Sequence, residues 1–301
     1  MDPLVDYDCL IFLKGLPKGF LVGDTHWGVG TFIDTSKKVL ANIAAQDCHF
    51  ESFLKGSPTG DVMAFISRTT EKERNDAIGT MLDRLDYVLD CYSTIADSPI
   101  KRSSVILVRE AKSLDVQLLH VERGGFAKLH SKTPVENDQW KARNRQLFNQ
   151  LLQYIDLRNG EEKGDELLTQ DLFHALRMYR LGSESSSHGL EFLAKFSALE
   201  CLVCGPQRDD RGRLLKSRLS NLLSDEDFYS ESLVEKLWEL RCLGSHQSRV
   251  SEHSLEDHHM PGGVAAIHVE QMFSCVLYFF LDNLKTVKNL DELWTKAGPF
   301  S

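Results

Sequence analysis

The sequence predicts an α+β domain over residues 1–135, followed by an all-helical domain over residues 136–301. The first part holds short apolar runs separated by Gly, Pro and Asp, which is typical of strands and turns. After Thr133 and Pro134, apolar residues instead recur every three or four positions, which is typical of helices. The length of 301 residues also fits two domains, because one domain holds roughly 150 residues.

Six segments of the first domain are predicted to be strands, because apolar and β-branched residues are bounded there by turn formers. They are residues 8–14, 19–23, 30–33, 62–66, 105–109 and 116–121. Between them, residues 71–95 carry apolar side chains at helical spacing, and Thr69 or Thr70 is expected to cap this helix. We expect the first domain to be a recognition or sensor module.

Six segments of the second domain are predicted to be helices, with Gly and Pro marking their ends. They are residues 138–157, 166–181, 187–204, 213–223, 230–244 and 264–287. The serines before the third of these helices are expected to cap it. The chain has no GxGxxG, GxxxxGK[ST] or GxSxG motif, so the sequence gives no support to a nucleotide-dependent enzyme or a serine hydrolase.

The composition is that of a folded globular protein, with 42% apolar and 26% charged residues. A formal charge of −9 argues against nonspecific binding along a duplex, although a local basic patch is compatible with nucleic acid. No apolar run is long enough to span a bilayer, and the N-terminus is acidic. Seven scattered cysteines do not resemble a disulfide framework. We therefore expect a cytoplasmic protein that does not enter the membrane.

The segment 233–247 holds the most informative polar residues, Arg241 and His246. On an uninterrupted helix, residues five positions apart lie about 140° apart around the axis. The pair can therefore face one site only if the helix ends or loosens at Gly244, where the sequence predicts an end. A guanidinium that holds phosphate oxygens and an imidazole that transfers protons would together suit metal-independent RNA cleavage. The spacing also fits a surface arginine followed by a histidine at a helix end.

Two helices of the second domain together resemble the Apea-like branch of the HEPN superfamily. The first covers residues 192–203 and contains Leu199 and Glu200, and the second contains Arg241 and His246. In that family, a helix with a Leu-Glu pair precedes a helix that ends in Arg and, a few residues later, His. The resemblance covers residues from about 140 to 290.

The resemblance implies a HEPN-like helical bundle that dimerises, so that two Arg-His pairs meet in one cleft. It also implies a metal-independent endoribonuclease of a defence or toxin system, with Arg241 and His246 as the catalytic pair. The implied partners are RNA, a second copy of the chain, and a protein or phage-derived trigger. Cys242 departs from the family, whose active members often have Asn or Asp at that position. An inactive HEPN-like module for dimerisation or RNA binding is therefore the alternative hypothesis.

Further residues are expected to serve this pair. Glu200 is expected to orient Arg241, although a purely structural ion pair would give the same pattern. Ser245 is expected to support His246. A basic run is expected to contact RNA phosphates, with a solvated charged surface as the alternative. It comprises Arg208, Arg211, Arg213, Lys216 and Arg218.

A metal site is the rival hypothesis, because imidazoles and carboxylates crowd the segment before the last predicted helix. These potential ligands are His246, Glu252, His253, Asp257, His258, His259 and His268. Their spacing matches no metal motif, and Cys201 and Cys204 form a lone CxxC in an apolar helix. We therefore expect neither a metal nor a cofactor, and most cysteines are expected to be buried thiols.

Overall fold

A computed structural model describes most of the chain. The described residues are 4–14, 30–55, 62–93, 101–111, 113, 116–120, 150–151, 166–185, 187–206, 209–247, 260 and 262–297. The chain divides into two compact units, which are Met1–Tyr92 with Ala96–Gly160, and Ser93–Ile95 with Glu161–Ser301. The predicted domain boundary near residue 135 lies outside the described residues.

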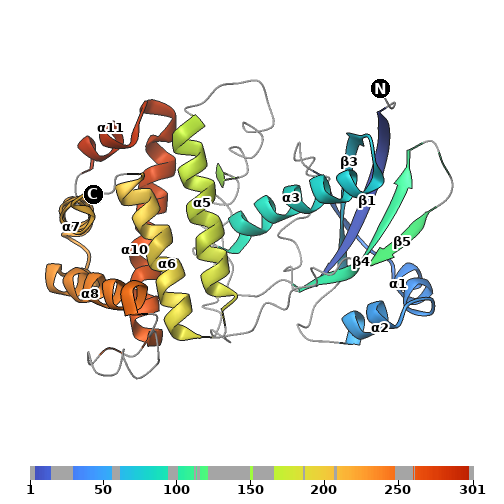
Figure 1. Cartoon of the computed structure of the whole chain (residues 1–301), viewed down its shortest axis with the longest axis horizontal. Helices are drawn as coiled ribbons and strands as arrows, with labels where there is room; N and C mark the ends of the chain where they lie inside the picture. Colours follow the sequence, from blue (N-terminus) through green and yellow to red (C-terminus); the bar gives the residue numbers. More distant parts are fainter. Residues whose placement is uncertain are drawn as a thin grey trace. The chain divides into compact units, whose positions relative to one another are not determined.

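The N-terminal unit is built on one antiparallel sheet of five strands in the order β2-β3-β1-β4-β5 (Figure 1). The strands are β1 (Val5–Lys14), β2 (Thr31–Asp34), β3 (Val62–Glu71), β4 (Lys101–Glu110) and β5 (Gln117–His120). Each corresponds to a predicted strand, and the sixth prediction, 19–23, lies outside the described residues. The prediction of an α+β part followed by helices is therefore confirmed.

Helices cover both faces of this sheet. On one face, α1 (Lys37–Ala44) and α2 (Cys48–Lys55) pack on Phe12 of β1, whose ring centroid lies 4.8 Å from that of Phe50. On the other face lies α3 (Arg74–Ser93), where Arg84 donates a hydrogen bond to the buried Ser67 of β3. The sheet is thus the middle layer of the unit, as Figure 1 shows.

Two predictions for this unit are wrong. The helix predicted for 71–95 begins only at Arg74, because Glu71 completes β3. Thr69 and Thr70 therefore lie in the strand and cannot cap the helix; the Thr70 hydroxyl donates to Asp6 instead. Helices α1 and α2 were not predicted, since eight residues each give too short a periodic pattern.

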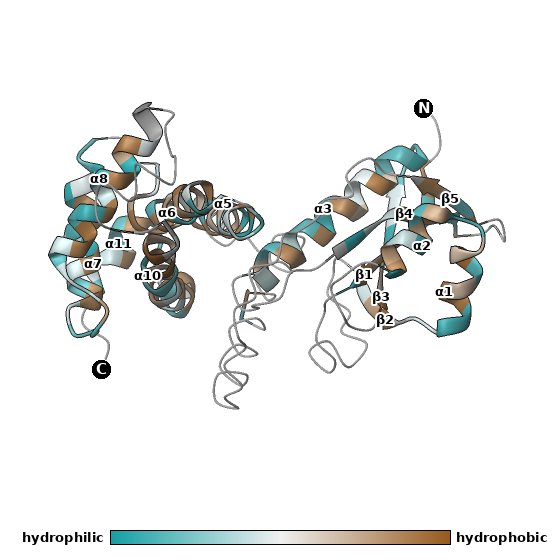
Figure 2. Cartoon of the chain, turned by 90° about the horizontal axis from the view of Figure 1, so that it is seen from below, coloured by the Kyte–Doolittle hydropathy of each residue, from teal (hydrophilic) through white to brown (hydrophobic). Residues whose placement is uncertain are grey.

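The C-terminal unit is helical, and α6 lies at its centre. Helix α6 (His188–Cys204) packs against α5 (Glu166–Ser183), α7 (Arg211–Leu223), α8 (Glu231–Gln247) and α10 (Gly262–Asn283). Ser187 caps α6, as predicted, by accepting a hydrogen bond from the Leu190 amide. Figure 2 shows apolar residues on both α6 and α10, which pack on each other. Buried Phe192, Phe196, Phe273 and Phe280 fill this core.

Helix α10 is followed by a 3-10 turn, η1 (Leu284–Thr286), and by a short helix, α11 (Leu290–Thr295), which was not predicted. Trp294 of α11 is buried, and its indole donates to the Leu202 carbonyl of α6. Of the helix predicted for 138–157, only residues 150 and 151 are described, and they are helical. The expectation that no apolar run is long enough to span a bilayer is wrong. Among the described residues, the segment Gly263–Asn283 is long and apolar enough to cross a membrane, but 56% of its most apolar window is buried, as in a core helix.

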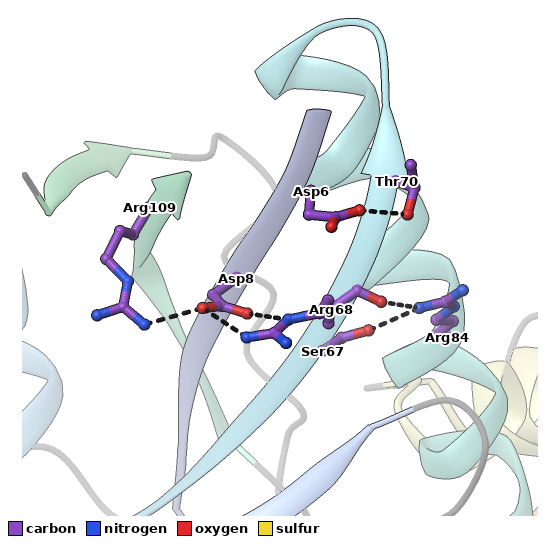
Figure 3. A network of polar contacts seen from close by, with 7 residues as sticks. All are labelled: Asp6, Asp8, Ser67, Arg68, Thr70, Arg84 and Arg109. Atoms are coloured by element: carbon purple, nitrogen blue, oxygen red, sulfur yellow. Dashed lines mark hydrogen bonds and ion pairs between the residues drawn. The ribbon is translucent and has the colours of Figure 1, made fainter. Parts of the chain in front are cut away.

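A polar network crosses the three central strands (Figure 3). Asp8 of β1 accepts hydrogen bonds from Arg68 of β3 at 2.7 Å and from Arg109 of β4 at 2.9 Å. These three residues are direct cross-strand neighbours in the antiparallel register. Arg68 and then Arg109 hold the pKa of Asp8 below its ordinary value, against the opposing effect of burial.

Replacing Asp8 with asparagine should weaken the centre of the sheet by about 1 kcal/mol at neutral pH, because two guanidinium groups lose their common anion. Since the folded-state pKa is lowered, the ionised carboxylate stabilises the fold above pH 3.8, and this contribution is lost as the pH falls through the folded pKa. Hydrogen–deuterium exchange in β1 and β3 would measure the difference between wild type and Asp8→Asn.

The difference should be large at neutral pH and small well below pH 3.8. Glu51→Gln is the control, because Glu51 pairs with Lys55 on the exposed surface of α2 and should contribute little. A difference between wild type and Asp8→Asn that persists unchanged in acid would contradict the assignment.

Candidate functional site

A buried ion pair joins α6 to α8. Glu200 of α6 is only 3% exposed, and its Oε2 accepts a hydrogen bond from Arg241 Nε of α8 at 2.9 Å. The guanidinium of Arg241 is partly exposed, so the pair connects the protein interior to the surface. Glu200 was expected to orient Arg241, and a carboxylate on Nε fixes the orientation of the guanidinium plane; a purely structural ion pair would make the same contact.

Trp238 supports the same guanidinium from one turn earlier in α8. The Arg241 guanidinium carbon lies 5.6 Å from the indole centroid, within the range of a cation–π contact. Trp238 also contacts Phe196 of α6, with ring centroids 6.3 Å apart. Gly212 of α7 lies against the indole, where a Cβ atom would come within 2.8 Å of a ring carbon. Arg241 is therefore held by a carboxylate and by an aromatic ring.

Arg211, the first residue of α7, approaches Glu200 from the other side. Its Nη1 lies 3.8 Å from Glu200 Oε1, and its Nη2 donates to the Gly205 carbonyl at 3.1 Å. The 3.8 Å separation is an ion pair rather than a hydrogen bond. One carboxylate thus lies between two guanidinium groups, which come from α7 and α8.

The remaining basic residues of the predicted RNA-binding run do not join this cluster through a described contact. Arg213 pairs with Asp210 at 2.7 Å, and Lys216 pairs with Glu235 at 2.6 Å, both on the exposed surface. Arg218 is buried; it donates to the Val203 carbonyl at 2.6 Å and pairs with the carboxylate of Asp291. Arg218 therefore supports the fold and is not placed to bind a phosphate, contrary to the expectation for this residue. Arg208 lies outside the described residues.

The predicted helix end at Gly244 is wrong, because α8 continues to Gln247. A glycine inside a helix costs only about 1 kcal/mol relative to alanine, so neighbouring contacts can outweigh its preference for a helix end. Within one chain, positions 241 and 246 thus remain about 140° apart around the axis of α8. The side chains of Ser245 and His246 lie outside the described residues.

Three of the four cysteines of the C-terminal unit are not poised for thiolate chemistry. Burial raises the pKa of Cys201 to about 12 and that of Cys204 to about 11. Their thiols donate to backbone carbonyls, so the CxxC is a pair of neutral thiols within a helix. Burial also raises the pKa of Cys242, beside Arg241. By contrast, Cys48 is exposed on α2.

Most of the rival metal ligands, including Glu252, His253 and His258, lie outside the described residues. His268 lies in α10 with its Nδ1 buried, and that atom has no hydrogen-bond partner in the described part of the chain. Within the same part, no three His, Cys, Asp or Glu side chains are grouped so that they could hold a metal ion. The described geometry therefore centres on Arg241.

Comparison with known proteins gives no relative for this chain. Neither a protein-family model, nor a curated protein, nor a solved structure matches it. The function must therefore be inferred from the cluster of Glu200, Arg211, Trp238 and Arg241. The contact of Trp238 with Arg241 was not predicted, although a spacing of three residues on one helix places the two side chains at neighbouring positions.

The contact between Gly212 and Trp238 predicts that Gly212→Ala destabilises the C-terminal unit. The added methyl group would meet the indole at 2.8 Å, and such overpacking costs about 1–3 kcal/mol, more than the roughly 1 kcal/mol gained in helix propensity. Thermal unfolding would measure the effect. Gly79→Ala is the matched control: nothing lies within 4 Å of its added Cβ, so that variant should be at least as stable as wild type. Equal stabilisation by both substitutions would contradict the tight contact.

Proposed function

We propose that the C-terminal unit is a HEPN-like endoribonuclease that cleaves RNA without a metal ion, with Arg241 and His246 as its catalytic residues. The observation that carries this proposal is the 2.9 Å contact between Glu200 and Arg241, which joins the two helices of the motif. A buried carboxylate that fixes a partly exposed arginine is an arrangement suited to phosphate recognition.

The proposed reaction uses the ribose 2'-hydroxyl of RNA. Its oxygen loses a proton and bonds to the adjacent phosphorus, the bond from phosphorus to the 5'-oxygen breaks, and the leaving oxygen takes up a proton. Arg241 stabilises the negative charge that develops on the phosphate oxygens. His246 transfers protons, for which an imidazole with an ordinary pKa of about 6.5 is suited. The products are a 2',3'-cyclic phosphate and a 5'-hydroxyl.

Substitution of either catalytic residue should lower the cleavage rate at least about 100-fold. The experiment compares wild type, Arg241→Lys and His246→Asn on single-stranded RNA in the presence of a chelator, with and without extracts that supply a trigger. The controls are Arg177→Lys and His174→Asn, which make the same chemical changes at exposed positions of α5. The thermal unfolding of each variant would show that it is folded.

Undiminished cleavage by His246→Asn or Arg241→Lys would refute the assigned site, and cleavage that stops with the chelator would favour the metal hypothesis. An alternative function is an inactive module that binds RNA or dimerises. Two observations favour it: Cys242 follows Arg241, and α8 continues past Gly244. RNA binding without a cleaved product under every condition would support this alternative.

A homodimer is part of the proposal, and its support is an apolar surface at one end of the helical unit. Four of the seven exposed large apolar side chains of the described residues lie where α5 ends and where α6 and α10 begin; they are Leu181, Leu190, Val264 and Ile267. A Cβ atom on Gly263 would lie 3.8 Å from the His188 imidazole, which places the starts of α10 and α6 together. A second copy of the chain would cover this surface.

In such a dimer, Arg241 of one chain and His246 of the other can complete one site, although the two positions diverge within a single α8. Mixing equal amounts of Arg241→Ala and His246→Ala should then restore cleavage that neither variant has alone, because each mixed dimer contains one intact site. Light scattering would establish the dimer, with Leu190→Asp expected to disrupt it. Dimers that mix but recover no cleavage would contradict a site shared between chains.

A further inference from the structure

We infer that Arg211 and Arg241 form a two-arginine clamp for a single phosphodiester group, held in place by Glu200. Arg211 is one of the five basic residues that the sequence predicts to contact RNA, and it would bind phosphate directly beside Arg241. That the ligand is RNA rests on the proposed function. The three residues come from different helices, α6, α7 and α8.

The clamp follows from the two ion pairs of one carboxylate. Arg241 Nε contacts Glu200 Oε2 at 2.9 Å, and Arg211 Nη1 lies 3.8 Å from Oε1. Because both contacts end on the same carboxylate, the two guanidinium groups are close to each other. Each guanidinium also has N–H donors that this carboxylate does not occupy.

The exposed fraction of each side chain shows which residues of the cluster can contact a ligand. The Glu200 side chain is 3% exposed, whereas those of Arg211 and Arg241 are 30% and 23% exposed. The carboxylate is thus buried, whereas both arginine side chains are partly exposed. A guanidinium carries five N–H donors in a planar fork, and a phosphodiester presents two anionic oxygens that match such a fork. Two arginines can therefore bind one phosphate from two directions.

Arg211 is positioned before a ligand arrives, and none of its described hydrogen bonds is to Glu200. Its Nη2 donates to the Gly205 carbonyl, which anchors the side chain on the turn between α6 and α7. Glu200 Oε1 has no hydrogen-bond partner within the described part of the chain, because Arg211 Nη1 at 3.8 Å is too distant. The guanidinium can therefore shift toward a phosphate without breaking a hydrogen bond to Glu200.

The neighbouring basic residues do not share a carboxylate with Arg241. Arg213 and Lys216 pair with other carboxylates on the exposed surface, and Arg218 is buried, where it pairs with Asp291 and lies over the Trp294 ring. Arg213 lies in the first turn of α7, as Arg211 does, and its side chain is 83% exposed. It therefore provides a matched control, because its loss removes the same charge from almost the same place.

The test measures binding of a fluorescently labelled single-stranded RNA in which every 2'-hydroxyl is methylated, so that it cannot be cleaved. Fluorescence anisotropy gives the Kd of the full-length wild type, Arg211→Gln, Arg211→Lys and Arg213→Gln over a series of salt concentrations. Arg211→Gln should weaken binding about 10-fold and reduce the salt slope by about 0.7, as expected for one lost contact to a single strand. Arg213→Gln should change the Kd less than about 2-fold.

Arg211→Lys retains the charge but not the fork, and it should bind with intermediate affinity while preserving the fold. If Arg211→Gln proves unstable, this variant still tests the clamp. Equal weakening by Arg211→Gln and Arg213→Gln, full affinity in Arg211→Gln, or a wild type that does not bind the RNA would overturn the clamp. A different result would contradict the nuclease proposal alone: the protein would bind unmethylated RNA with a Kd that depends on Arg211, but it would not cleave that RNA.

Discussion

The helical unit depends on the burial of Glu200 in its central helix. A carboxylate in the protein interior is costly unless it is paired and hydrogen-bonded. Glu200 is compatible with this core because Arg241 of α8 donates a hydrogen bond to it and Arg211 of α7 forms an ion pair with it. The same helix carries buried Lys195, which pairs with Glu191 at 2.7 Å and with Glu270 of α10 at 3.0 Å. The charged residues of α6 therefore favour packing in which an oppositely charged residue of α8 or α10 faces α6.

Such buried ion pairs favour one packing arrangement of the helices over others more than they raise the net stability of the fold. Removing two charges from water costs several kcal/mol per ion, and an apolar pair of the same shape is often equally stable. Leaving one charge alone, however, costs about 3–5 kcal/mol, which penalises any packing that separates Glu200 from Arg241. The apolar residues of α6 drive its burial, whereas Glu200 and Lys195 determine the register in which α8 and α10 pack on it.

Local patterns predicted most of the described elements but not the three-dimensional site. The strands and long helices follow from periodicity, and the contact of Glu200 with Arg241 was expected from the paired motif helices. The end of α8 was predicted wrongly, because a preference of about 1 kcal/mol at Gly244 is small beside tertiary packing. Arg211 joins the site through a contact between α6 and α7, for which sequence spacing carries no signal. The contact of Trp238 with Arg241 lies within α8, where a spacing of three residues could have indicated it.

The exposure of Cys48 on α2 has a practical consequence for work on the purified protein. The other six cysteines are buried or partly buried, so air oxidation should attack Cys48 first. Two molecules linked covalently through their N-terminal units would double the apparent mass in gel filtration without any contact between helical units. Samples kept under reductant, or carrying Cys48→Ser, would separate this storage artefact from true self-association.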